Sequence, residues 1–170
     1  MEVEISGRVE SVVILAVVQG WRVADLGLEE RWRRRETPDV EGVVFRSGEL
    51  HLMEFSMPSG PMWFPRLSAR DWEPVGWIDF DTELVTERIR DWVVRGGESS
   101  AHGSIGWLSA AHADELDQPA WVLTSGYSNP FIRIRSDHGF FEAFTTSGFI
   151  WRVRLEDPLD LTIRFANETA

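Results

Sequence analysis

The sequence predicts an α+β domain dominated by antiparallel β-sheet, with a helical insertion near residues 82–117. Short runs of β-branched and aromatic residues, separated by Gly, Pro, Asp and Ser, divide most of the chain as they divide antiparallel strands. The 170 residues fit one domain with three parts: an N-terminal meander at 1–80, the insertion at 82–117 and a C-terminal meander at 121–166. The two sets of strands either form one curved sheet or close into a barrel, and the pattern leaves both open.

The N-terminal part is predicted from apolar runs and turn residues. Residues 12–18 form an apolar, β-branched run typical of a buried strand, although a short helix ending at Gly20 has a similar pattern. A charged stretch around Trp32 predicts a short helix before Pro38. The turn residues Ser47-Gly48 predict a hairpin. The predicted strands here are residues 43–45, 50–55, 62–64 and 75–80, with a turn at residues 58–61 between the last two.

The helical insertion is predicted from apolar residues spaced at the helical period. Val85, Ile89, Trp92 and Val93 fall at i, i+4, i+7 and i+8, with charged residues between them. A carboxylate of the Asp79-Phe80-Asp81 segment would cap the start, and the glycines at 96 and 97 would end the helix. Residues 109–117 predict a second short helix, and residues 96–106 a mobile loop.

The C-terminal part carries the strongest pattern. Residues 132–135, 140–144, 149–155 and 161–165 alternate apolar and polar side chains, with a turn at each junction, and predict four consecutive antiparallel strands. One face of this meander is apolar. The residues predicted on that face are Ile132, Ile134, Trp151, Val153, Leu155, Ile163 and Phe165. The opposite face is predicted to carry Arg133, Arg135, Arg152, Arg154 and Arg164.

Charge and composition exclude several classes of function. The 28 acidic residues outnumber the 17 basic ones and give a net charge of −11 and a pI near 4.8. This balance opposes binding to nucleic acid and to anionic membranes, and favours a basic partner. No secretory leader or membrane-spanning run occurs, and cysteine is absent, so we expect a soluble, cytoplasmic protein without disulfides or thiolate chemistry.

All 17 basic residues are arginine, and tryptophan occurs nine times. Planar guanidinium groups and indole rings suit rigid recognition. The alternative explanation is codon usage, since a GC-rich genome would produce the same arginine bias.

No segment has a catalytic or metal-binding spacing. The four histidines lack the spacing of metal ligands, and Gly126-Tyr127-Ser128-Asn129-Pro130 lacks the final glycine of a nucleophile elbow. We therefore expect neither a metal nor a cofactor.

Candidate binding residues are tryptophans near strand ends, where an indole is often half exposed, and the arginine face. They are Trp63, Trp72, Trp77, Trp107, Trp121, Arg133, Arg135, Arg152 and Arg154. The simpler interpretation is that the tryptophans pack in the core and the arginines pair with nearby carboxylates.

Two functions fit the sequence, and it leaves open whether the protein is an enzyme. The first is a binding protein that recognises a basic macromolecule, as an antitoxin- or immunity-type inhibitor does. The second is a cofactor-free cyclase of secondary metabolism that holds a hydrophobic substrate in an aromatic-lined cavity, with Glu54, Tyr127, Arg133 and Glu142 as its polar groups. Residues 96–106 or the Trp32 helix would form the lid of that cavity. A sensor of anionic ligands that uses the arginine face ranks third.

Overall fold

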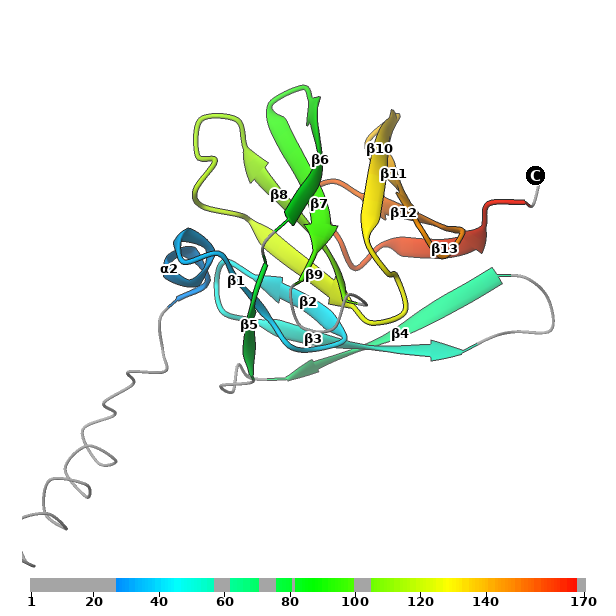
Figure 1. Ribbon diagram of the computed structural model, residues 1–170, viewed down its shortest axis with the longest axis horizontal. Helices are drawn as coiled ribbons and strands as arrows, with labels where there is room; N and C mark the ends of the chain where they lie inside the picture. Colours follow the sequence, from blue (N-terminus) through cyan, green and yellow to red (C-terminus); the bar gives the residue numbers. More distant parts are fainter. Residues whose placement is uncertain (1–26, 57–61, 71–75, 81, 100–104, 168–170) are drawn as a thin grey trace, which may run out of the picture.

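The computed structural model describes residues 27–56, 62–70, 76–80, 82–99 and 105–167 (Figure 1). These ranges contain a single short helix, and the rest of the regular structure is strand. The elements are α2 (Leu28–Arg33), β1 (Glu36–Pro38), β2 (Gly42–Phe45), β3 (Leu50–Ser56), β4 (Met62–Arg70), β5 (Trp77–Asp79), β6 (Thr82–Ile89), β7 (Trp92–Glu98), β8 (Gly106–His112), β9 (Trp121–Ser125), β10 (Phe131–Asp137), β11 (Phe140–Thr145), β12 (Phe149–Arg154) and β13 (Leu161–Phe165).

Eleven of the strands form one sheet in the order β10-β11-β12-β13-β4-β3-β2-β9-β8-β7-β6. Every pair of neighbours in it is antiparallel. Strands β1 and β5 form a separate two-stranded sheet. The predicted dominance of antiparallel β-sheet is therefore confirmed.

The large sheet curls until its two edge strands meet. Strands β6 and β10 contact each other, and Figure 1 shows them side by side, but no ladder of backbone hydrogen bonds joins them in the described part of the chain. Of the two arrangements that the sequence left open, the structure therefore has a curved sheet that is not closed into a barrel. We call the contact between β6 and β10 the seam.

The concave face of the sheet encloses the main core. Trp121, Phe131, Phe141 and Trp151 are at most 1% exposed and fill it. The Trp121 and Phe141 rings stack with their centroids 6.2 Å apart, and the Phe131 and Trp151 rings meet edge to face at 5.6 Å. Aromatic side chains each remove a large apolar area from water, so these four supply much of the stability of the interior.

A second core lies outside the sheet, beneath α2 and the β1–β5 pair. Trp32 of α2 is 5% exposed and packs against Phe80 and Trp107, with ring centroids 4.8 and 5.4 Å away. The short helix predicted around Trp32 is confirmed, and Trp32 anchors it to the sheet. Strands β2, β8 and β9 are consequently buried on both faces, as in Val43 and Val44 of β2.

The predicted C-terminal meander is confirmed as β10 to β13. Ile134, Trp151, Val153 and Ile163 lie in the core as expected. Ile132 does not: it is 48% exposed, and Phe131 is buried in its place. A register shift between Phe131 and Arg133 explains this difference, because the extra residue of a β-bulge reverses the faces on one side of it.

The predicted helical insertion is wrong. Residues 82–98 form the β6–β7 hairpin, and residues 106–112 form β8. Val85 and Ile89 are four residues apart, a spacing that places both on one face of a strand as well as on one face of a helix. Long-range packing decides between the two, since β7 pairs with β8 along its whole length. The glycines that suggested a helix end permit close approach within β7 instead: a Cβ on Gly97 would lie 2.0 Å from the carbonyl oxygen of Thr82.

The predicted turn residues form the expected hairpins. Gly48 and Gly148 have φ angles of 90° and 85°, and the amide of each donates a hydrogen bond to the carbonyl three residues earlier. His138 and Gly139 both have positive φ angles in the two-residue turn between β10 and β11. This is the turn geometry that the right-handed twist of a hairpin favours.

The strands predicted at 62–64 and 75–80 differ in length from those observed, β4 and β5. Strand β4 continues past Pro65, although proline has no amide hydrogen to donate. Among the described residues, only Met62 and Trp63 of β4 pair with β13, so from Pro65 onward the edge of β4 that faces β13 forms no hydrogen bonds to it. The predictions for residues 12–18 and 58–61 lie outside the described residues. No helix in the described ranges has the length and apolar character needed to cross a lipid bilayer.

A glycine substitution tests the close approach of β6 to β7. Gly97→Ala is expected to lower the free energy of unfolding by about 1–3 kcal/mol, because its methyl group collides with the backbone of Thr82. An unchanged or higher free energy of unfolding would contradict this pairing of the two strands. Urea unfolding of the parent and the variant measures the sign. Gly76→Ala is the control, since its methyl group meets Asp39 only at ordinary contact distances of 3.4 Å and beyond.

Candidate functional site

Turns of the large sheet meet at one end of the molecule. They connect β2 to β3, β6 to β7, β8 to β9, β10 to β11 and β12 to β13. Backbone hydrogen bonds join neighbouring turns. The amide of Ala113 in the β8–β9 turn donates to the carbonyl of Asp91 in the β6–β7 turn over 2.8 Å. The amide of Leu155 in the β12–β13 turn donates to the carbonyl of Gly139 in the β10–β11 turn over 3.2 Å. We call this end the turn end; the β6–β7 and β10–β11 hairpins stand at the top of Figure 1.

Unpaired carboxylates gather at the turn end. We call this set the acidic rim, and it comprises Asp91, Asp114, Asp117, Glu156 and Asp157. All five are exposed, and none forms an ion pair with another described residue. Only two arginines here, Arg88 and Arg90, likewise lack a carboxylate partner within the described ranges. Negative charge therefore predominates at this end and attracts a cationic partner.

An aromatic pair and an exposed leucine adjoin the acidic rim. The rings of Trp92 and His112 face each other across β7 and β8, with centroids 4.0 Å apart, and Trp92 is half-buried. Leu116, between two rim acids, is 38% exposed. Arg46, in the turn between β2 and β3, forms an ion pair of 2.7 Å with Glu115. This pair holds the β8–β9 loop, which carries Leu116. The rim thus combines fixed charge with apolar contact area, as many protein interfaces do.

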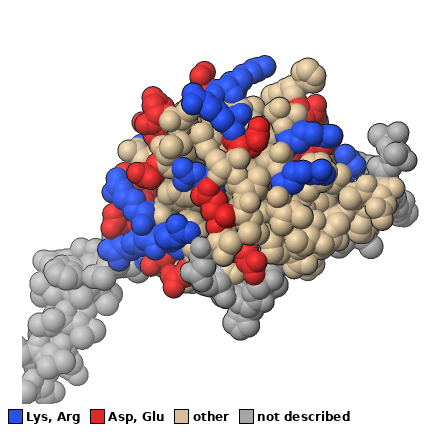
Figure 2. Space-filling model, turned by 45° about the horizontal axis from the view of Figure 1, so that its top comes forward, with Lys and Arg blue, Asp and Glu red and all other residues tan. Residues whose placement is uncertain are grey.

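The predicted arginine face lies on the convex side of β10 to β13. Its guanidinium groups stack on two phenylalanines: that of Arg133 lies 3.7 Å from the Phe144 ring centroid, and that of Arg152 lies 3.6 Å from the Phe140 centroid. Arg154 also contacts Phe140, at 4.4 Å. In the view of Figure 2, basic side chains lie next to acidic ones over much of the surface.

Most of this face is neutralised by ion pairs. Arg152 pairs with Asp137 at 2.9 Å, and Arg154 Nε bonds to Asp160 over 2.6 Å. Arg135 pairs with Glu142. These pairs match the simpler interpretation of the face as arginines bound to their neighbours; Arg133 alone among the four predicted binding arginines has no carboxylate partner within the described ranges.

Glu142 is the buried acceptor of the arginine face. It is 6% exposed and pairs with Arg135 on β10 and with Arg164 on β13, the latter at 3.1 Å. The two guanidinium groups compensate the charge that burial would otherwise make costly.

The predicted binding tryptophans separate into core and half-buried residues. Trp107 and Trp121 are 0% and 1% exposed, so the expectation that they are half exposed is wrong. The indole N–H groups of both donate to backbone carbonyls, those of Glu98 and Leu155. Trp77 is half-buried beside Arg31, whose guanidinium lies 4.9 Å from its ring. The side chain of Trp63 and all of Trp72 lie outside the described residues.

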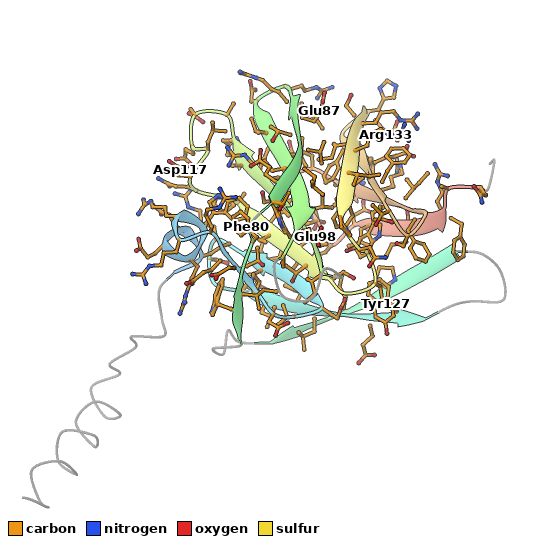
Figure 3. The ribbon with its side chains drawn as sticks, viewed as in Figure 1. Phe80, Glu87, Glu98, Asp117, Tyr127 and Arg133 are labelled. Atoms are coloured by element: carbon orange, nitrogen blue, oxygen red, sulfur yellow. The ribbon has the colours of Figure 1, made fainter. Side chains whose placement is uncertain are left out.

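The structure does not bring the four polar groups of the cyclase hypothesis around one cavity. Glu54 is exposed on β3, next to Phe55 whose side chain packs against the core. Figure 3 shows Tyr127 at the lower right and Arg133 at the upper right of the view, apart from each other. Arg133 and Glu142 lie on the convex face, away from the enclosed interior.

Packed side chains fill the interior in the described part of the chain. An apolar hollow at the end opposite the turn end has a volume of about 10 Å³ and is lined by Phe55, Tyr127, Phe149, Trp151 and Ile163. It is smaller than the space that one small organic ligand needs.

Comparison with models of protein families finds no match for this chain, and comparisons with curated proteins and with solved structures find none either.

Sequence reasoning did not select Trp92 or the carboxylates of the turns as a site. Trp92 was assigned to the apolar face of the expected helix, and acids in turns are individually unremarkable. The alternation of hairpin ends could have indicated that these turns converge, once residues 82–98 were recognised as a hairpin.

A neutral replacement of Glu142 tests the buried acceptor. Glu142→Gln is expected to lower the free energy of unfolding by about 1–3 kcal/mol, since two guanidinium groups lose a charged partner. Asp160→Asn is the control: its side chain is 44% exposed, so we expect a loss of less than about 1 kcal/mol. Thermal and urea unfolding measure both. Equal losses in the two variants would contradict the prediction that the buried carboxylate of Glu142 contributes more to stability than the exposed one of Asp160.

Burial raises the pKa of Glu41, at the end opposite the turn end. The Gly126 amide and the Ser125 hydroxyl bond to this carboxylate and offset the rise, while the charge of Asp39 adds to it. One oxygen, Oε2, is buried without a hydrogen-bond partner among the described residues. The folded chain thus holds this proton more tightly than the unfolded chain, in which the pKa is near 4.5. Glu41 therefore stabilises the fold most below that pH, and this contribution is lost as the pH rises through the folded-state pKa.

Glu41→Gln removes this titration. We expect the variant to have an unfolding midpoint at or above that of the parent at neutral pH, and to lose the advantage as the pH falls to about 4. Thermal unfolding across this range measures the difference. Glu54→Gln, at an exposed carboxylate, is the matched control and is expected to shift the midpoint little. A Glu41→Gln variant that is less stable at neutral pH than at pH 4, relative to the parent, would refute the prediction.

Proposed function

We propose that this protein is a non-enzymatic binding protein that recognises a basic macromolecule through the acidic rim, in the manner of an antitoxin- or immunity-type inhibitor. The observation that carries the proposal is the gathering of unpaired carboxylates beside Trp92 and Leu116 at the turn end. Unpaired charges steer an oppositely charged partner, and apolar anchors among them supply the affinity.

The placement of these groups supports a protein partner. The rim acids come from three separate turns, so they present charge over a broad surface instead of around one point. Figure 3 shows Asp117 and Arg133 on opposite sides of the molecule, so this part of the acidic rim lies away from Arg133. The net charge of −11 extends the attraction of a basic partner beyond the contact surface.

Two further features support binding over cyclisation. A cyclase of the proposed kind needs an enclosed cavity for a hydrophobic substrate, and side chains fill the described interior. Trp32 packs α2 into the second core, where it is not free to act as a lid. We also propose a cytoplasmic location, because a chain without cysteine suits a reducing compartment.

Binding of deca-arginine and deca-lysine peptides, measured by calorimetry at low and at physiological salt, tests the acidic rim. The variant Asp91→Asn, Asp114→Asn, Asp117→Asn is expected to bind both peptides about tenfold or more weakly than the parent, because each lost charge removes part of the attraction. The control variant Glu29→Gln, Glu30→Gln, Glu54→Gln changes the net charge equally but leaves the rim intact. We expect it to stay within about twofold of the parent. Equal losses in the two variants would show that the rim is no site.

A further inference from the structure

A groove crosses the turn end between the β6–β7 and β10–β11 hairpins. It has a volume of about 340 Å³. Its walls are Arg88, Ile89 and Arg90 on one side and Ser136, Asp137, His138 and Gly139 on the other. The groove lies at the seam, where the two edge strands contact each other without a shared ladder.

Each hairpin carries a bulky side chain at a turn position with a positive φ angle. Arg90 has a φ angle of 58° and His138 one of 40°. Two-residue hairpin turns favour such angles, and glycine or asparagine occupies them more readily than arginine. The turns themselves therefore do not require these two side chains. Both line the same groove, although they are 48 residues apart in sequence (138 − 90).

The charge of the groove is positive. Arg88 and Arg90 form no ion pair with any described residue, and Arg88 Nε donates only to the Arg90 carbonyl, over 3.3 Å. Asp137 is the one carboxylate that lines the groove, and it is engaged by Arg152 at 2.9 Å. The groove therefore offers two guanidinium groups, an imidazole and the Ser136 hydroxyl to a ligand.

We propose that this groove binds a small dianion, such as a phosphate or a dicarboxylate, between Arg88 and Arg90 on one hairpin and His138 on the other. Guanidinium groups bind both kinds of anion through paired hydrogen bonds. This site lies beside the acidic rim and does not depend on the function proposed for it.

The surroundings limit the size of the ligand. A second hollow of about 250 Å³ adjoins the groove at Ile89, Arg90 and Gly139. Asp91 and Glu156 line it together with Arg154, whose charge is compensated by Asp160. The two unpaired carboxylates repel the rest of any larger polyanion. A nucleic acid is therefore a poor ligand for the groove, and a compact anion suits it.

Calorimetric titration with inorganic phosphate and with succinate tests the site, and succinamide serves as the uncharged control ligand. Arg90→Asn and His138→Asn are the decisive variants. Each is expected to bind phosphate or succinate more weakly than the parent, by about tenfold for Arg90→Asn, which loses a charged donor. Each is also expected to unfold at the same temperature as the parent or higher, because asparagine tolerates positive φ angles better. Arg46→Gln removes a guanidinium at the turn end outside the groove and is expected to leave binding unchanged.

Weaker binding together with unchanged or higher stability supports the site, and the preferred anion identifies its ligand class. Absence of phosphate and succinate binding to the parent would overturn the proposal. Equal loss of binding in Arg46→Gln would also overturn it, since the anion would then respond to overall charge alone. A lower unfolding temperature of both asparagine variants would show that Arg90 and His138 serve the fold.

Discussion

The structure depends on the burial of three neighbouring strands on both faces. Strands β2, β8 and β9 bear the enclosed core on one face and the packing of α2 and the β1–β5 pair on the other. Alternate residues of each strand point to opposite faces, so both sets must be apolar or small. Val43 and Val44 show this in β2, and Trp107 and Leu108 in β8. This double burial fixes the middle of the sheet, and the strands on either side curl from it.

The curl of the sheet places the chemistry at its ends and edges. Filling the concave face with aromatic rings leaves no room there for a ligand in the described part of the chain. Many of the charged side chains lie on the convex face and in the turns. On the convex face arginines and carboxylates largely compensate one another, with Glu142 between two guanidinium groups. In the turns several charges stay unpaired, and there the acidic rim and the cationic groove lie next to each other.

The sequence was most informative where structure is decided locally. The alternation of residues 149–155 and the glycine at each hairpin turn correctly indicated the C-terminal meander, since both depend on neighbours in the chain. The same reasoning failed for residues 82–98. The spacing of Val85 and Ile89 fits both a helix and a strand. The strand is formed because β7 pairs with β8, which lies farther along the chain. The predicted exposure of Trp107 was wrong for a similar reason. This residue lies near a strand end, but α2, which is distant in sequence, covers it.

The sequence alone determined a predominantly antiparallel sheet, an acidic molecule and a meander with arginine on one face, because side-chain alternation, turn residues and net charge are properties of short segments or of composition. Only the tertiary structure decided that the sheet curls without closing, that the turns converge, and that Arg90 and His138 meet across one groove. These features depend on which distant strands pack together. That choice follows from the summed burial of many side chains, which no single segment encodes.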